Sequence, residues 1–116
     1  LNTPWPKSRG LVAALEAELA SADSEDRLVD GLFGALADTT EAADEALPDT
    51  GLDRGRERQL SARRIVDPRY GTRSSTVLII REDGQARLDE LSYAADGELR
   101  GRVTRAWQLA GSLLPA

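Results

Sequence analysis

The sequence of 116 residues carries 15 basic and 20 acidic side chains, a formal net charge of −5, and no His, Cys or Met. A chain of this length forms one domain at most, and its 41% hydrophobic and 30% charged residues are typical of globular proteins. The absence of His and Cys excludes a Ser-His-Asp triad, a thiol nucleophile, a disulfide and a zinc-thiolate site within these residues.

Charge is distributed unevenly along the chain. Residues 1–53 hold 3 basic and 12 acidic side chains, whereas residues 54–116 hold 12 basic and 8 acidic ones. Nucleic-acid-binding domains usually have a pI above about 9 and cations gathered on one face. Here acids are interleaved with the cations and aromatic residues make up only 4%, so we expect no nucleic-acid partner. No apolar run approaches the length of about 18 residues that a membrane span requires.

The acidic half predicts two amphipathic helices, over about residues 9–22 and 25–38. Leucines recur at every fourth position in each segment, at Leu11, Leu15, Leu19 and at Leu28, Leu32, Leu36. This spacing places them on one face of a helix. Ser8 is an expected N-cap of the first helix, and Asp23 or Ser24 of the second.

The second half predicts a short helical turn through Arg54–Gln59 and then a small antiparallel sheet. Strands are expected over about residues 60–66, 74–82 and 85–93, with Asp83-Gly84 and Asp96-Gly97 as hairpin turns.

Two strands of this sheet differ in character. Thr76–Ile80 is apolar on both faces, which is typical of a central strand covered on both sides. Arg87, Asp89 and Glu90 make the returning strand more polar, which favours an edge or an exposed face. The tail from Thr104 to Leu114 fits either a last amphipathic helix or a frayed end.

The densest set of polar groups lies just before the apolar strand. A Gly-containing turn exposes backbone N–H groups, and a neighbouring Arg offers parallel donors to a carboxylate or phosphate. The candidate ligand-binding residues are therefore Tyr70, Thr72, Arg73, Ser74 and Ser75. The structural alternative is that the hydroxyls satisfy the backbone of the loop and that Arg73 pairs with an Asp.

The acidic side chains of the second half do not predict a metal site. The spacing of Asp83, Asp89, Glu90 and Asp96 fits no EF-hand loop, and Asp in hairpin turns has a backbone role. We expect no metal and no catalytic residue within these 116 residues.

Four stretches occur in the order and spacing of the NRDE family, also called the transport and Golgi organisation 2 family. They are Thr3-Pro4-Trp5-Pro6-Lys7, Ala46-Leu47-Pro48-Asp49-Thr50-Gly51, Arg58-Gln59-Leu60-Ser61-Ala62 and Tyr70-Gly71-Thr72-Arg73-Ser74-Ser75-Thr76-Val77-Leu78. The chain resembles the C-terminal part of the family's domain from Leu1 to about Gly97. Two features depart from the family: Arg64 stands where an apolar strand residue is preferred, and Thr104–Ala116 does not resemble the closing strand.

The resemblance implies an N-terminal-nucleophile-hydrolase-like αββα sandwich. Residues 1–116 would form a single incomplete domain of the α+β class, with two N-terminal helices followed by a small antiparallel sheet. The partner of this part would be the missing N-terminal part of the same domain, which in the family begins with Met-Cys and an Asn-Arg-Asp-Glu motif. Without that partner we expect exposed apolar edges on Thr76–Ile80, and either association or low stability.

The resemblance implies a binding or trafficking role for a bacterial, cytoplasmic protein, with a small molecule as ligand and haem as a possible cargo rather than a resident cofactor. Since His, Cys and Met are absent, Tyr70 and Tyr93 are the only side chains that could ligate haem iron. The alternative is an amide-bond hydrolase whose nucleophile lies in the missing N-terminal part, with Arg73 beside it. A third interpretation is a purely structural module.

Overall fold

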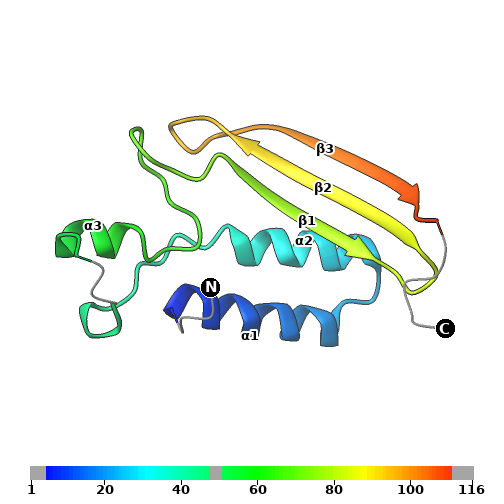
Figure 1. The fold of residues 1–116 in the computed structure, drawn as a ribbon, viewed down its shortest axis with the longest axis horizontal. Helices are drawn as coiled ribbons and strands as arrows, with labels where there is room; N and C mark the ends of the chain where they lie inside the picture. The colour runs from blue at the N-terminus through cyan, green and yellow to red at the C-terminus, as the bar shows by residue number, and fades with distance from the viewer. Residues whose placement is uncertain (1–4, 48–50, 111–116) are drawn as a thin grey trace.

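Helices precede a three-stranded antiparallel sheet in this protein, as the sequence predicts (Figure 1). The computed structural model describes residues 5–47 and 51–110. Its elements are α1 (Pro6–Ser21), α2 (Glu25–Leu36), the 3-10 helix η1 (Asp44–Ala46), α3 (Arg54–Gln59), β1 (Ser74–Ile80), β2 (Gln85–Tyr93) and β3 (Leu99–Gln108). The α+β fold class is confirmed.

The first residues of each long helix explain where that helix begins. α1 begins at Pro6, because the fixed φ of proline suits the first helical position. It therefore starts earlier than predicted, and Ser8 lies inside the helix instead of capping it. α2 begins at Glu25 as predicted, and the Ser24 side chain accepts a hydrogen bond from the Arg27 backbone N–H at 3.1 Å.

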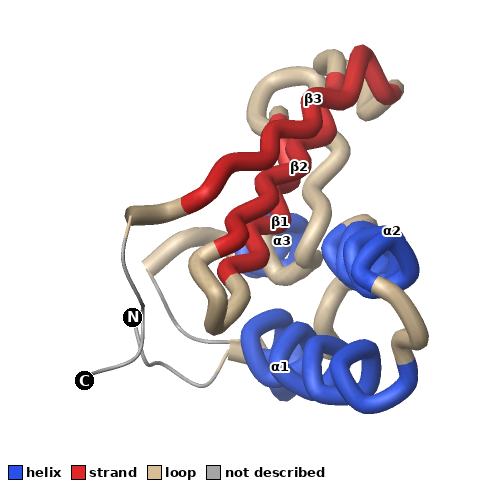
Figure 2. The backbone as a smooth tube through the Cα atoms, turned by 90° about the vertical axis from the view of Figure 1, so that its right-hand side faces the viewer, coloured by secondary structure: helices blue, strands red, loops and turns tan. Residues whose placement is uncertain are grey.

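α2 lies between α1 and the sheet and contacts both (Figures 1 and 2). The apolar core consists of Val29 and Phe33 of α2 and Val77 of β1. The partly buried residues packed around them are Leu32, Leu36, Ile79 and Leu91. The leucine stripe of α2 therefore contributes to the core as its spacing predicts.

α1 is held much less firmly than α2. It has no buried residue, and Val12, Leu15 and Leu19 are 55%, 40% and 60% exposed. Its apolar stripe, predicted to face a core, is thus left uncovered by the described residues. At Gly31 of α2 a Cβ atom would meet the Glu18 carboxyl group of α1, which is the far end of a flexible side chain and can move aside.

The predicted strand over residues 60–66 is absent, and this segment forms turns and bends after α3. The Ser61 side chain turns inward, where it donates a hydrogen bond to the Arg58 carbonyl at 2.6 Å and accepts one from the Ala42 N–H at 2.7 Å. Ala62 is buried beside it. A serine that bonds nearby backbone groups competes with strand pairing, and here that competition decides the local structure.

The order of strands in the sheet is β1-β2-β3, which corrects three expectations. β1 is an edge strand in this sheet and is covered on one face only, since Val77 is buried whereas Leu78 and Ile80 are 52% and 46% exposed. β2, the polar strand, is the central one. β3 occupies the other edge, where a last helix or a frayed end was expected, while residues 111–116 lie outside the described residues.

Both predicted hairpin turns are confirmed. The turns are not of the primed type expected for an Asp-Gly pair, because neither Asp83 nor Asp96 has a positive φ. Each is a three-residue loop that ends in a glycine with left-handed φ, 87° at Gly84 and 88° at Gly97, and glycine adopts this region without strain. In each turn the preceding Asp accepts a backbone hydrogen bond, from Gln85 N–H to Asp83 and from Glu98 N–H to Asp96.

One face of the sheet is open. Side chains alternate along each strand, so the register places one set of residues opposite the face that α2 covers. This open face consists of Ser74, Thr76, Leu78, Ile80, Ala86, Leu88, Glu90, Ser92, Gly101, Val103, Arg105 and Trp107. The radius of gyration is 16.5 Å, whereas a compact domain of this length has about 13 Å, so the core is small for the chain. The predicted exposed apolar surface on Thr76–Ile80 is present.

Candidate functional site

The predicted ligand-binding segment leaves a tight loop and enters β1. The loop is closed by Thr72, whose N–H donates to the Ile65 carbonyl at 2.8 Å and whose hydroxyl accepts from the Ile65 N–H at 3.0 Å. A Cβ atom on Gly71 would lie 2.9 Å from the Ile65 carbonyl oxygen, so only glycine fits this crossing. The Thr72 hydroxyl thus satisfies loop backbone, as the structural alternative predicts.

Tyr70 lies on the surface of the same loop. Its side chain is 56% exposed, and the Arg56 guanidinium lies 5.3 Å from the ring centroid. Asp67 orders the loop by accepting hydrogen bonds from the N–H groups of Arg69 and Tyr70 at 2.7 Å and 3.3 Å. The bond from Arg69 is the main cause that lowers the pKa of Asp67.

Arg73, Ser74 and Ser75 differ in their surroundings. Ser75 is buried at 7% exposure on the α2 side of the sheet, whereas Ser74 is exposed at the start of β1. Arg73 is exposed, and its carbonyl accepts a hydrogen bond from the Tyr93 N–H at 2.8 Å. Across residues 5–47 and 51–110 its guanidinium forms no hydrogen bond or ion pair. The predicted Arg73–Asp pair is therefore not found, and Tyr70, Arg73 and Ser74 are the members of the set that are exposed to solvent.

A second polar cluster lies at the centre of β2, and the sequence analysis did not single it out. Asp89 has an exposed fraction of 0%. It accepts hydrogen bonds from Arg87 Nε at 2.6 Å, Arg102 Nη2 at 2.9 Å and the Thr104 hydroxyl at 2.7 Å. The hydrogen bond from Arg87 is the main cause that lowers the pKa of Asp89 to about 2, so this carboxylate stays ionised.

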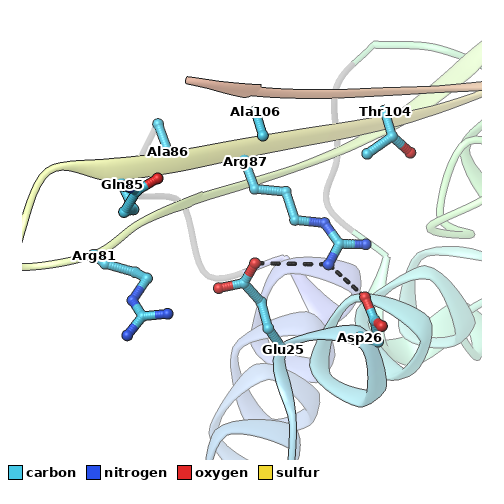
Figure 3. A pocket seen from close by; sticks show the side chains of 8 residues that line it. All are labelled: Glu25, Asp26, Arg81, Gln85, Ala86, Arg87, Thr104 and Ala106. Carbon is cyan, nitrogen blue, oxygen red and sulfur yellow. Dashed lines mark hydrogen bonds and ion pairs between the residues drawn. The ribbon is translucent and has the colours of Figure 1, made fainter. Parts of the chain in front are cut away.

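The same two arginines connect the sheet to α2. Arg87 Nη1 donates to Asp26 Oδ1 at 2.5 Å and lies 3.6 Å from Glu25 Oε1 (Figure 3). Arg102 Nη1 lies 3.8 Å from Asp30 Oδ1, and its guanidinium lies 5.4 Å from the ring centroid of Phe33. Asp89 therefore orients two cations that hold α2 against the strands.

A cleft of about 520 Å³ opens between the N-terminal end of α2 and the sheet. Its lining residues are Glu25, Asp26, Arg81, Gln85, Ala86, Arg87, Thr104 and Ala106 (Figure 3). Both signs of charge are present, and Arg87 is already occupied by three carboxylates. None of the candidate residues at positions 70–75 lines this cleft, so we assign its polar groups to the joining of α2 and the sheet.

Tyr93 is covered by the arginine that departs from the family pattern. The Arg64 guanidinium lies 4.0 Å from the Tyr93 ring centroid and also donates a hydrogen bond to the Gly97 carbonyl. Tyr93 is 6% exposed, so among the two tyrosines only Tyr70 is open to a ligand. Within the described part of the chain, no group of three or more His, Cys, Asp or Glu side chains is placed to hold a metal ion.

Glu57 of α3 is also buried, with an exposed fraction of 6%. Its Oε2 atom accepts no hydrogen bond from the residues described, but it lies 3.6 Å from Arg54 Nη1. The ion pair offsets part of the cost of burying this charge, and the residue lies outside the candidate segment.

The family model for Transport and Golgi organisation 2 matches residues 1–95. The chain belongs to this family. The resemblance stated from the four motifs is confirmed, and in this transport and Golgi organisation 2 protein the match covers α1 to β2 together with the Tyr70–Ser75 segment. β3 lies beyond the matched residues. No curated protein sequence matches the chain, and no helix in the described ranges is long and apolar enough to cross a membrane.

Proposed function

We propose that this transport and Golgi organisation 2 protein binds a small anionic molecule, and that Arg73 and Ser74 form the contact. The observation that carries this proposal is the exposed Arg73 guanidinium, which lacks a protein partner within the described ranges and follows a closed glycine loop. An arginine of this kind can give two parallel hydrogen bonds to a carboxylate or phosphate. Tyr70, Thr72 and Ser75 then support the site: Thr72 closes the loop, Ser75 anchors β1 and Tyr70 borders it.

The contrast with other arginines supports this choice. Several arginines of the second half are engaged with a carboxylate or a backbone carbonyl, namely Arg58, Arg63, Arg64, Arg69, Arg87 and Arg102. Their donors are thus partly used inside the protein. Arg73 keeps all of its donors for a ligand, as the exposed Arg27 does, and of these two arginines only Arg73 follows the closed glycine loop.

The buried Asp89 carboxylate is a poor general base, because its pKa of about 2 lies far from the operating pH and it already accepts hydrogen bonds from three donors. The family resemblance suggests trafficking in the cytoplasm and haem as a cargo. Haem carries two carboxylates that can accept hydrogen bonds from Arg73. Tyr70 is the exposed one of the two tyrosines, so it is the candidate ligand of the haem iron.

We also propose that the open face of the sheet packs against a second sheet, as the sandwich implied by the family resemblance requires. α2 covers one face of the sheet, and the apolar open face has the composition of a surface that packs against a second sheet. In the parent domain, a preceding part of the same domain would supply that sheet. The polar end of β1, with Arg73 and Ser74, would then lie at the rim of the sandwich.

Titration of the 116-residue chain tests the binding proposal. Metal-free protoporphyrin IX, haemin and inorganic phosphate serve as probes, with binding followed by calorimetry and, for the porphyrins, by absorbance. Loss of a charged hydrogen-bond pair of about 1.5 kcal/mol corresponds to about tenfold in affinity. We therefore expect Arg73→Gln to weaken binding of the dicarboxylate porphyrins about tenfold.

The matched control is Arg27→Gln, since Arg27 is also exposed and its side chain forms no hydrogen bond or ion pair with a described residue. Equal affinities of the two variants, or no binding of any probe by the unaltered chain, would refute the proposal. Protoporphyrin binding equal to haemin binding would show that the carboxylates, rather than the iron, are recognised.

The hydrolase alternative rests on the family resemblance alone. It predicts amidase activity in a longer family member that carries the Met-Cys start, with loss of that activity when this Cys is replaced by Ala. In the 116-residue chain it predicts no activity, with or without the Arg73 side chain.

A further inference from the structure

A pocket at one end of the helix pair brings together the first and third of the four stretches that carry the family resemblance. The N-terminal end of α1 and the C-terminal end of α2 lie at this end of the pair (Figure 1). Lys7 of the first stretch donates a hydrogen bond to the Leu60 carbonyl of the third at 2.8 Å. Lys7 and Ser61 line the pocket, which has a volume of about 170 Å³. The ligand site at Arg73 belongs to the fourth stretch and lies outside this pocket.

Lys7 brings a half-buried positive charge to the pocket. Its Nζ atom lies 5.6 Å from the centroid of the Trp5 ring and donates one hydrogen bond, to the Leu60 carbonyl. In the described part of the chain it forms no ion pair with a carboxylate. Because an ammonium group has three N–H donors, two donors of Lys7 remain for a ligand.

Arg63 brings a second positive charge, held between the two long helices. Its side chain is 19% exposed, and its Nη1 atom donates to the Ala35 carbonyl of α2 at 3.0 Å. Its Nη2 atom lies 3.9 Å from Asp38 Oδ2, which is too far for a hydrogen bond. On the other side Nη2 lies against α1, where a Cβ atom on Gly10 would be only 2.5 Å from it.

Two carboxylates line the same pocket, those of Asp38 and Glu41. Asp38 Oδ1 accepts a hydrogen bond from the Thr40 N–H at 2.8 Å. Hydrogen bonding from the Thr40 hydroxyl and N–H lowers the pKa of Asp38 below its ordinary value, so this group stays ionised at neutral pH. The pocket therefore holds two positive and two negative groups, and none of the cations is hydrogen-bonded to a carboxylate.

We propose that this pocket binds a small free amino acid as a zwitterion. The carboxylate of the ligand accepts hydrogen bonds from Lys7 and Arg63, and its ammonium group donates to Asp38 and Glu41. A volume of about 170 Å³ is the space of about six water molecules at about 30 Å³ each. It therefore suits a molecule of the size of glycine, alanine or serine.

The cleft at the opposite end of α2 shows that mixed charge alone does not make a site of this kind. There Arg87 is hydrogen-bonded to the carboxylates of Asp26 and Asp89 at 2.5 Å and 2.6 Å, so an anionic ligand would have to displace them. Lys7 and Arg63 donate to backbone carbonyls instead. A ligand carboxylate thus supplies the anion that a partly buried cation normally has.

Titration of the full 116-residue chain with L-alanine tests the proposal, followed by calorimetry and by NMR of the backbone amides. The amide signals of Thr40 and Ala42 at the pocket should shift, and propionate, which lacks the ammonium group, should bind at least tenfold more weakly. Loss of a charged hydrogen bond corresponds to about tenfold in affinity, which is the effect expected of Lys7→Gln. The matched control is Arg9→Gln, an exposed cation of α1 outside the pocket, which should leave the affinity unchanged.

Two further variants separate binding from folding. Gly10→Ala adds a methyl group that pushes the flexible end of Arg63 aside, while alanine favours the helix. It should weaken L-alanine binding severalfold without lowering the melting temperature. Asp38→Asn keeps an oxygen that can accept from the Thr40 N–H, so the loop is retained. It should weaken L-alanine binding about tenfold and leave propionate binding unreduced.

Three outcomes would overturn the proposal: no shift of the two amides with glycine, L-alanine or L-serine at millimolar concentration, equal affinities for propionate and L-alanine, or equal affinities of Lys7→Gln and Arg9→Gln. The site at Arg73 is measured independently. Arg73→Gln should leave the alanine titration unchanged, and Lys7→Gln should leave the porphyrin titration unchanged. Failure of one proposal is therefore distinguishable from failure of the other.

Discussion

Replacement of Asp89 by Asn is the sharpest test of how this fold is held together. The change keeps the shape of the side chain but removes the charge that three donors surround at 2.6 Å, 2.9 Å and 2.7 Å. The pKa of Asp89 is about 2 against an ordinary value of 3.8. Since one pKa unit corresponds to about 1.4 kcal/mol, ionised Asp89 stabilises the folded chain by about 2 kcal/mol relative to the neutral form.

The Asp89→Asn substitution would cost more than this, because the new amide N–H group adds a donor where the neighbours are donors already. Breaking one side of a buried ion pair typically costs about 3–5 kcal/mol. We expect Asp89→Asn to lower the free energy of unfolding by about 3 kcal/mol at pH 7, as measured by urea denaturation followed by circular dichroism. The matched control is Asp83→Asn, where the side chain is exposed and the amide oxygen can still accept from the Gln85 N–H; it should change stability by less than about 0.5 kcal/mol.

The pH dependence has a definite sign. The folded pKa of Asp89 is depressed, so its contribution is fully present above the unfolded value near 4 and is lost as the pH falls through about 2. The stability gap between the unaltered chain and Asp89→Asn should therefore shrink between about pH 4 and pH 2. Equal stabilities of the Asp89 and Asp83 variants at pH 7, or a gap that does not change with acid, would refute the role assigned to Asp89.

Three further substitutions test the packing. Gly71→Ala should destabilise the chain by about 1–3 kcal/mol in urea denaturation, because the Cβ would lie 2.9 Å from the Ile65 carbonyl oxygen and backbone would have to move. Gly34→Ala should raise stability by about 0.5–1 kcal/mol in the same assay, since the added methyl group in the helix interior meets no atom within 4 Å; a loss would contradict the packing of α2. Val29→Ala removes a side chain of 0% exposure from the small core and should lower the melting temperature, with about 2 kcal/mol lost.

Local chemistry in the sequence predicted the parts of the fold that depend on neighbouring residues. The Ser24 cap and the Asp-Gly turns at positions 83–84 and 96–97 depend on hydrogen bonds to backbone N–H groups only two or three residues away. A short stretch of sequence is therefore enough to predict them. The short helix Arg54–Gln59 was predicted as well, because a helix of this length also depends on residues that are close in the sequence.

Long-range pairing decided what the sequence could not predict. β3 is a strand because it pairs with β2, and its residues are exposed along its whole length, so no apolar alternation marks it. Asp89 looked like an ordinary surface acid because its partners Arg102 and Thr104 follow more than ten residues later. The spacing of Arg87 and Asp89, two apart on one strand face, was the available signal for this cluster.

The candidate site was predicted in part. The Tyr70–Ser75 segment was predicted correctly as a loop leading into a strand. The structural alternative also predicted that its hydroxyls bond the loop backbone, as Thr72 does. Which of the polar side chains would remain unpaired depended on burial: Ser75 faces α2, whereas Arg73 faces solvent. Burial of this kind follows from the arrangement of α2 over the sheet and not from the segment itself.

The weak attachment of α1 has a consequence for hydrogen exchange. Because α1 contains no buried residue while α2 carries Val29 and Phe33 into the core, α1 can open without disturbing the sheet. Its amides should exchange through local opening at a free energy well below that of global unfolding. The amides of α2 and β2 should exchange only with the whole chain, so this small protein consists of two units that unfold at different free energies.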